Sequence, residues 1–239
     1  MKNILTTIFG LLIGVSLLAQ STYNDANAEV RDVKGFHGVK VSTGIQLVLT
    51  QGSTEAVAIS APNQEEKNRI KTVVENGILK IYYDYDVWKL MKGRVSKNLK
   101  AYVSIVNIQT LAVSSGASLK TDNEITGDNI NIDASSGGMM NAKLKAKSLN
   151  VEHSSGAMIT LSGTADNIDI DGSSGAVFHG YDLAVNSCKA ETSSGAVAQI
   201  TANKEMSGRA SSGGHVSYKG DANLVNKRTS SGGSVGRKD

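Results

Sequence analysis

Residues 148–176 read SLNVEHSSGAMITLSGTADNIDIDGSSGA and contain a unit that recurs through the second half of the chain. The tripeptide Ser-Ser-Gly occurs seven times, with its first serine at positions 114, 135, 154, 173, 193, 211 and 230. A period of about nineteen residues is typical of stacked-repeat folds, in which each unit buries its apolar side against its neighbours. The repeat therefore decides the fold.

Apolar residues keep a fixed distance from every Ser-Ser-Gly. Most residues five and three positions before the first serine are apolar, and so are those five positions after it. The positions two and four before it are mostly polar, which is the alternation of a strand with one buried side. Each unit thus supplies two strands and a corner without room for a helix. The pattern predicts an all-β fold, a parallel β-helix with coils of about 19 residues.

The tripeptide itself is interpreted as the corner of the coil. Glycine permits a left-handed backbone there, and the next residue is always Ala or Gly, which indicates crowding by the coil above. Hydroxyl groups such as those of Ser114 and Ser115 are expected to hydrogen-bond from coil to coil. Seven copies without a matching His and acid do not indicate a nucleophile. The structural corners are Ser114, Ser115, Gly116, Gly137, Gly156, Gly175, Gly195, Gly213 and Gly232.

The chain divides into three parts by composition. Residues 1–28 resemble a signal peptide, because Lys2 precedes an apolar run over 4–19, and cleavage is expected after residue 19 or 28. Residues 29–107 form an N-terminal β-rich part with a short helix expected within 62–75, and residues 108–239 form the repeat β-helix. We expect the two parts to be one continuous β structure. After signal removal no stretch is apolar enough to span a membrane.

Composition excludes several functions. The net charge is +3 and no dense basic cluster appears, so nucleic acid is not an expected partner. A single Cys188 allows no intrachain disulfide and is expected to be a small buried apolar residue. The histidines at 37, 153, 179 and 215 lack zinc-site spacing and are expected at the surface or at corners. No metal and no cofactor is predicted.

Two columns of the repeat differ from the simple alternation of apolar and uncharged polar residues. An acid stands two positions before the first serine in four consecutive units, at Asp133, Glu152, Asp171 and Glu191. This stripe could bind a cation or a basic partner, but a solvated face is the preferred interpretation. Four positions after the first serine stand Met139, Met158, Val177 and Val197, beside the apolar column at five. We favour burial or intrachain packing of this second column; it is nonetheless the best candidate for an interaction surface.

The order of the motifs resembles a known family. The start Phe36-x-Gly-Val-x-Val, the strand that follows Ser42-Thr43-Gly44, the strand Gly77-Ile-Leu-Lys-Ile and the serial Ser-Ser-Gly-Ala coils are similar to the head GIN domain of autotransporter adhesins from Bacteroidetes-type bacteria. The resemblance covers nearly all of the chain after the signal. It implies a right-handed β-helix at the cell envelope, and it supplies no catalytic residues.

These observations favour an exported, noncatalytic envelope protein with an adhesion or ligand-binding role. Its location would be the periplasm, the outer-membrane surface or the exterior, and its partner an envelope protein or a glycan. One alternative is a polysaccharide-active enzyme, a glycan lyase or hydrolase, using the acid pair Asp169 and Asp171. Another is a self-assembling structural protein or homo-oligomer, although Lys227 and the polar tail indicate a capped C-terminal end.

Overall fold

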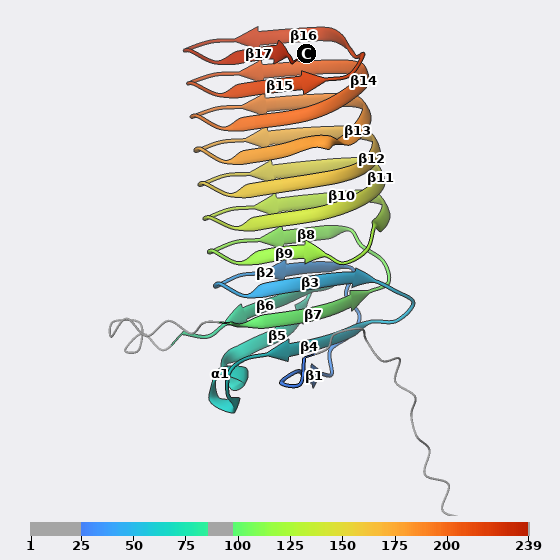
Figure 1. The fold of residues 1–239 in the computed structure, drawn as a ribbon, viewed down its shortest axis with the longest axis vertical. Helices are drawn as coiled ribbons and strands as arrows, with labels where there is room; N and C mark the ends of the chain where they lie inside the picture. Colours follow the sequence, from blue (N-terminus) through green and yellow to red (C-terminus); the bar gives the residue numbers. More distant parts are fainter. Residues whose placement is uncertain (1–24, 86–97, 239) are drawn as a thin grey trace, which may run out of the picture.

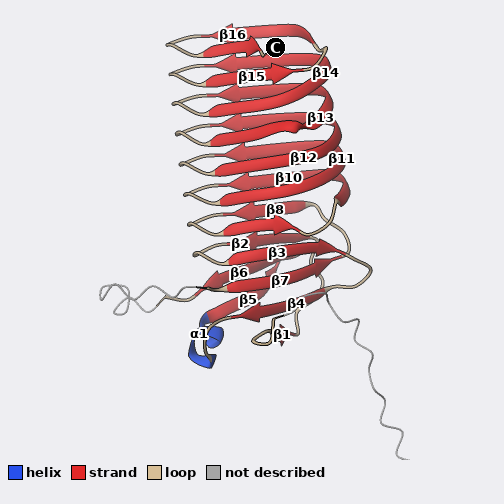
Figure 2. Ribbon diagram, in the orientation of Figure 1, coloured by secondary structure: helices blue, strands red, loops and turns tan. Residues whose placement is uncertain are grey.

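The computed structural model describes residues 25–85 and 98–238, which stack into a column of β-coils with a distinct N-terminal end (Figure 1). Almost all of the regular structure is strand, and one short helix lies beside the N-terminal end (Figure 2). The predicted parallel β-helix with coils of about 19 residues is confirmed. The signal sequence predicted for residues 1–28 lies mostly outside the described residues.

The elements follow one another in a simple order. The N-terminal part contains β1 (Glu29–Arg31), β2 (Gly38–Val41), β3 (Gln46–Gln51), β4 (Ala56–Ser60), α1 (Gln64–Arg69), β5 (Ile70–Glu75), β6 (Ile78–Tyr83) and β7 (Lys100–Ile105). The repeats contain β8 (Thr110–Val113), β9 (Ser118–Thr121), β10 (Ile125–Ala134), β11 (Met139–His153), β12 (Met158–Gly172), β13 (Val177–Thr192), β14 (Val197–Ala210), β15 (His215–Lys219), β16 (Asn223–Thr229) and β17 (Ser234–Arg237).

Each repeat coil has two faces joined by the corner at one end and by a bend at the other (Figure 1). The face that leaves the corner, here the leading face, contains β9, the first parts of β11 to β14, β15 and β17. The face that runs back to the corner, here the returning face, contains β8, β10, the later parts of β11 to β14, and β16. On each face every strand pairs in parallel with the next coil.

The core fills the space between the two faces. Leu149 pairs with Ile168 and Val151 with Ile170 on the returning face, and all four side chains are buried. The apolar column at five positions past the serine supplies the leading face of the core. Its members are all buried: Leu119, Met140, Ile159, Phe178, Ala198, Val216 and Val235. Each buried side chain of this size stabilises the fold by roughly 1.5–3 kcal/mol.

The corner is a tight turn with two left-handed residues. Ser115 has φ 52° and Gly116 has φ 69°, and Ala117 donates its N–H to the carbonyl of Ser114, as in a type I′ turn. Coil-to-coil bonds at the corner are made by the backbone: Gly116 donates to the carbonyl of Ser136 at 3.1 Å, and the equivalent bond recurs in the other coils. The expected ladder of serine hydroxyls is wrong, because the corner serines make no such bond within the described residues.

Crowding behind the corner is confirmed, but it comes from the preceding coil. A Cβ atom on Gly138 would lie 2.7 Å from the carbonyl oxygen of Val113. Where the space is larger the position holds a buried alanine, such as Ala157 or Ala176. The residue after the tripeptide is therefore small because it faces the backbone of the coil before it.

The N-terminal part contributes two further coils to the same stack. β2 pairs with β6 and β8, and β3 pairs with β7 and β9, all in parallel. The coil of β2 and β3 therefore lies between the coil of β6 and β7 and the coil of β8 and β9 (Figure 1). Its corner is Ser42-Thr43-Gly44, where Thr43 has φ 58° and Gly44 donates to the carbonyl of Ser115. The predicted continuity of residues 29–107 with the repeats is confirmed.

Antiparallel strands close the N-terminal end. β4 pairs with β7 on one face and β5 pairs with β6 on the other, while β1 lies beyond β4. The helix expected within 62–75 is shorter in the structure and consists of α1 alone. Asn63 caps its start, because the side-chain oxygen of Asn63 accepts a hydrogen bond from the N–H of Glu66. Ile70–Glu75 is strand β5, because its β-branched residues pair with β6 through the left-handed turn at Asn76 and Gly77.

Candidate binding surfaces

The column at four positions past the serine forms an apolar strip on the outside of the leading face. Met139 is 51% exposed and Met158 is 44% exposed, and Val177 and Val197 are partly exposed. They pair directly from coil to coil, so at the usual strand spacing of about 4.8 Å the four side chains extend over about 14 Å. We call these four residues the apolar strip.

The preference for burial of the apolar strip was wrong. The turn leaves the strand alternation intact, so Ala157 points inward, Met158 outward and Ile159 inward. The two adjacent apolar columns therefore lie on opposite sides of the strand. The column continues with Gln46 and Ser118 toward the N-terminal end and with His215 and Ser234 toward the C-terminal end.

A polar column runs beside the apolar strip, two residues further along each strand. It contains Asn141, Thr160, His179 and Gln199, which pair from coil to coil. Nδ1 of His179 lies 3.0 Å from Oε1 of Gln199. A ligand on the apolar strip would thus find hydrogen-bonding groups along one side of it.

The predicted acidic stripe lies on the outside of the returning face. Asp133, Glu152, Asp171 and Glu191 pair in register across four coils. A shallow hollow of about 230 Å³ lies over the first three, next to the corner. The column that contains the stripe has basic residues at both ends. Toward the N-terminal end of the stack, Asp133 is followed by Ala112, Lys40 and Lys80. Toward the C-terminal end, Glu191 is followed by Arg209 and Arg228.

The four acids of the stripe differ in their partners. Glu191 lies 3.3 Å from the Lys189 ammonium and 3.4 Å from the Arg209 guanidinium. Asp133, Glu152 and Asp171 are exposed and have no ion pair among the described residues. Uncompensated like charges on adjacent strands are mildly destabilising, and water and salt reduce the effect. This arrangement fits the solvated face that the sequence favoured.

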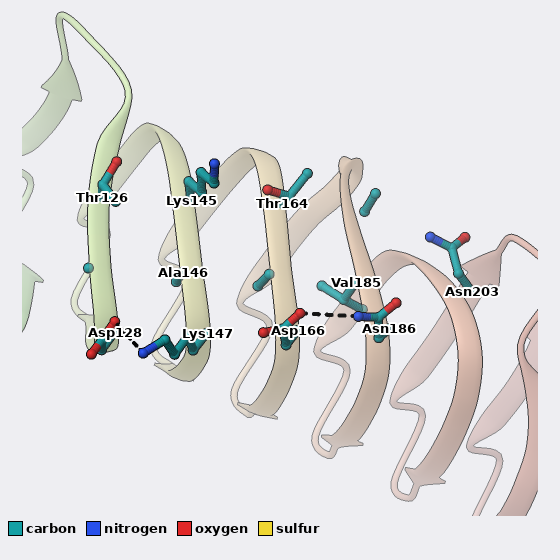
Figure 3. A pocket seen from close by; sticks show the side chains of 13 residues that line it. Thr126, Asp128, Lys145, Ala146, Lys147, Thr164, Asp166, Val185, Asn186 and Asn203 are labelled. Atoms are coloured by element: carbon teal, nitrogen blue, oxygen red, sulfur yellow. Dashed lines mark hydrogen bonds and ion pairs between the residues drawn. The ribbon is translucent and has the colours of Figure 1, made fainter.

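A groove that the sequence did not predict follows the bend opposite the corners. It has a volume of about 450 Å³, and its lining includes the small residues Gly127, Ala146 and Ala165. Figure 3 shows two rows of polar side chains along it. One row contains Thr126, Lys145 and Thr164, and the other contains Asp128, Lys147, Asp166 and Asn186. The strands bend here, and the small residues of the lining lie against the core: Ala165 is buried and Ala146 is partly buried beside it.

The acids near these surfaces already have partners. In the groove, Asp128 pairs with Lys147 at 3.0 Å and Asp166 accepts a bond from Asn186 at 3.1 Å. On the returning face, Asp169 pairs with Lys189 at 3.1 Å, so it is not a free partner for Asp171. General acid–base catalysis on a glycan needs two carboxyl groups on opposite sides of one bond. Here the acids form rows along a flat surface.

Two buried groups bear on the predicted chemistry. Cys188 is 3% exposed, as expected for a small apolar residue, and burial raises the pKa of its thiol to about 12. His153 is 2% exposed, so the surface position was wrong for it, whereas the corner position agrees with the expectation; it lies on the inner side of the corner with Nδ1 3.0 Å from the carbonyl oxygen of Asp171. Burial lowers the pKa of the His153 imidazole.

Residues 25–85 and 98–238 contain neither a metal-binding cluster nor a membrane-spanning helix. No group of three or more His, Cys, Asp or Glu side chains in that part of the chain is placed to hold a metal ion. The helical residues described there are too few and too polar to cross a bilayer.

Comparison with solved structures shows the same fold in four-fifths or more of each chain. A "putative adhesin" from Bacteroides fragilis NCTC 9343 has a TM-score of 0.75 at 19% identity, covering 88% of this chain and 95% of that one. A "putative lipid binding protein" from Parabacteroides distasonis ATCC 8503 has a TM-score of 0.68 at 14% identity, covering 90% and 98%. A "putative adhesin" from Parabacteroides merdae ATCC 43184 has a TM-score of 0.67 at 14% identity, covering 89% and 95%.

Comparison by sequence agrees with the resemblance found in the motifs. No curated protein matches the chain. Residues 35–222 match the family model described as "Putative auto-transporter adhesin, head GIN domain", a range that begins just before Phe36 and ends after the sixth Ser-Ser-Gly, which starts at Ser211. The chain belongs to this head GIN domain family.

Proposed function

We propose that the protein is an exported, noncatalytic binding protein of the bacterial cell envelope that attaches to an envelope protein or a glycan. The observation that carries the proposal is the apolar strip, whose residues Met139 and Met158 are about half exposed on a strand face. Exposed apolar side chains that line up over several coils indicate a contact surface. The names of the related structures, adhesins among them, support the same role.

The fold suits attachment better than catalysis. Both faces of the stack are flat and hydrogen-bonded from coil to coil, so the apolar strip and its polar neighbours Asn141 and Thr160 are held at a fixed spacing. Such a surface can bind an extended partner without reorganising itself, which reduces the entropic cost of association. The ion-paired acids Asp128 and Asp169 give the enzyme alternative no support.

The test is binding by purified protein lacking the signal sequence. We expect Met139→Ser with Met158→Ser to weaken retention on isolated outer-membrane fractions and on any glycan that the wild type binds on an array. Serine is the natural residue of this column at 118 and 234, so the fold should tolerate it. The matched control is Asn131→Ser with Asn150→Ser, which changes two exposed positions of the returning face.

The outcomes separate the alternatives. Equal retention of the strip variant and the wild type would remove the apolar strip as the contact surface. Strip-dependent binding to protein-free lipid vesicles would make lipid the ligand, in keeping with the name of the P. distasonis relative. Cleavage of a glycan by the wild type, lost in Asp169→Asn with Asp171→Asn, would favour the enzyme. Fractionation of cells that express the full chain tests export.

A further inference from the structure

We propose that the C-terminal edge of the β-helix binds an extended acidic peptide segment, which adds to β16 as a further strand. β16 pairs only with β14, and β17 pairs only with β15, so both strands have an open edge in the described structure. Every residue of β16 is exposed. The edge, its charge and its apolar side chains each indicate part of the chemistry of the partner.

The open edge of β16 presents backbone groups in a known direction. The N–H of Ser230 donates to the carbonyl of Ala210 in β14. In a parallel sheet successive residues direct their N–H and C=O groups to opposite neighbours. The backbone groups of Lys227 and Thr229 therefore point to the open side, where a further strand can bond to them. An exposed edge of this kind is a template for strand addition.

The corner ladder ends at the same edge. Each corner glycine donates its N–H to a serine carbonyl of the next coil, and the last of these bonds runs from Gly213 to Ser231. The N–H of Gly232 has no acceptor among the described residues. A backbone or carboxylate oxygen of an added segment can accept this bond, so the corner adds a donor beside β16.

Charge at this end selects an acidic partner. Residues 200–238 contain seven Lys and Arg and two Asp and Glu, whereas residues 121–199 contain four Lys and ten Asp and Glu. Arg209 and Arg237 are paired with Glu191 and Asp221. Lys227 and Arg228, in β16 itself, have no ion pair in the described part of the chain. Two unpaired cations on an open strand attract a segment with carboxylates opposite them.

Apolar side chains on the same strand determine where the acids of the partner lie. Leu224 is 38% exposed and pairs with the buried Met206, so the next strand should place an apolar residue above it. Val225 is 62% exposed where the register shifts by one residue. The complementary segment thus carries apolar residues at its start or end and acids opposite 227 and 228.

A second copy of the chain fits this edge poorly. Two C-terminal ends would bring like charges together across the edge, because the basic excess of residues 200–238 would face itself. At the opposite end of the stack, β1 and β5 are the outer strands of antiparallel pairs with β4 and β6. Helix α1 lies beside β5, and charged side chains there form ion pairs, such as Lys80 with Glu75. An acidic extended peptide therefore fits the edge better than either end of another copy.

The experiment measures binding of a fluorescein-labelled nine-residue peptide, Thr-Val-Val-Thr-Glu-Glu-Thr-Val-Val, to the purified mature protein by anisotropy. Its apolar residues near both ends and its two central acids match this order in either strand direction. We expect saturable binding that Lys227→Glu with Arg228→Glu weakens at least tenfold. The matched control, Lys34→Glu with Lys120→Glu, changes the net charge equally at exposed lysines far from the C-terminal edge and should leave Kd unchanged. A peptide N-methylated at every second residue, with the same charge, should bind at least tenfold more weakly.

Amide exchange measured by NMR supplies a readout that charge alone does not move. On peptide binding we expect slower exchange at Lys227 and Thr229, whose N–H groups face the open edge. The proposal would be overturned if the wild type bound the N-methylated and the unmethylated peptide equally well. It would also be overturned if the two double charge variants bound the peptide with equal affinity. So would binding to phosphatidylglycerol vesicles with no binding to the peptide, or a dimer in sedimentation experiments in which the same two amides are already protected.

Discussion

The imidazole of His153 fills the space that a side chain at residue 172 would need. The two residues pair in adjacent coils, and a Cβ atom on Gly172 would lie 2.5 Å from Cε1 of His153. The ring also lies 6.1 Å from the ring of Phe178, so it cannot move deeper into the core without displacing a second ring. Gly172 and His153 thus share one volume inside the corner column.

Enlarging residue 172 should therefore destabilise the protein. Gly172→Ala is expected to lower the free energy of unfolding by about 1–3 kcal/mol through overpacking. His153→Ala with Gly172→Ala should lose less than the sum of the two single changes, because the new methyl group enters the space that the ring leaves. Urea unfolding followed by circular dichroism measures both effects. Strictly additive losses would contradict the shared volume.

Acid should weaken the fold through the same histidine. Burial lowers the pKa of His153 below its ordinary value of 6.5, so the unfolded chain takes up this proton before the folded protein does. As the pH falls through 6.5 the free energy of unfolding should decline, with a slope of at most about 1.4 kcal/mol per pH unit from this group. Above that pH the group makes no pH-dependent contribution.

The pH effect is checked by urea titrations between pH 5 and pH 8. His153→Gln should make the stability less dependent on pH below 6.5. The control is His215→Gln, which changes an exposed imidazole. If the two variants keep the same pH slope as the wild type, protonation of His153 does not limit the acid stability.

The left-handed corner makes opposite predictions for its two central residues. Gly156 has φ 69° and open space around it, so Gly156→Ala should cost about 1 kcal/mol from backbone conformation alone. Ser155 has φ 53°, and Ser155→Asn should stabilise by about 0.5 kcal/mol because asparagine tolerates this region better. Melting temperatures measure both changes.

The corner prediction has a matched control. Gly236→Ala makes the same substitution where the added methyl also meets open space but the backbone is not left-handed. We expect it to leave the melting temperature nearly unchanged. A loss as large as that of Gly156→Ala would mean that the turn conformation is not the cause.

Charge neutralisation should act differently along the acidic stripe. Asp171 has no ion pair among the described residues, so Asp171→Asn should raise stability by about 0.3 kcal/mol in 10 mM salt and by less in 500 mM salt. Glu191 bridges Lys189 and Arg209, so Glu191→Gln should give no such gain. Thermal melts at both salt concentrations provide the measurement. A rise in melting temperature with calcium that Asp171→Asn removes would instead show cation binding.

The thiol of Cys188 should stay unreactive until the protein unfolds. It is 3% exposed and burial raises its pKa to about 12, so little thiolate forms and no reagent can approach. At pH 8 a disulfide reagent should label Cys188 only in denaturant. A control protein with Cys188→Ser and Ser212→Cys, at an exposed corner, should react at once. Fast labelling of the folded wild type would contradict the buried position.

The repeat fold could be predicted because corner and core residues keep a constant distance from each other. The orientation of the apolar strip could have been found from Ala157 and its equivalents, which are buried and fix the alternation for Met158. Strand β5 was mistaken for helix because Ile70, Val73 and Val74 have helical spacing, whereas in the strand Val73 lies on the exposed side, opposite Ile70 and Val74. The corner Ser42-Thr43-Gly44 carries the same signal as the others, but the inserted residues 52–77 interrupt the period around it.

The groove could not be predicted from the repeat pattern, and neither could the two lysines at the N-terminal end of the acidic stripe. The groove forms where the coils bend, and the coil lengths vary on that side, as the register shift between Thr160 and Ser162 shows. Lys40 and Lys80 join the acidic column only because coils distant in sequence become neighbours. Such neighbours depend on the order of coils in space, which a local period does not contain.

The position of β2 and β3 between coils that come later in the chain has a consequence for synthesis. β3 gains its two neighbours only when residues 100–105 and 118–121 have emerged from the ribosome. Strands β2 to β9 must therefore assemble together, over long sequence separations that slow folding. Each later coil needs only the one before it. Whole coils could be added or lost between Asp122 and Thr229 without disturbing the start, so the length of the stack is free to change while its base is not.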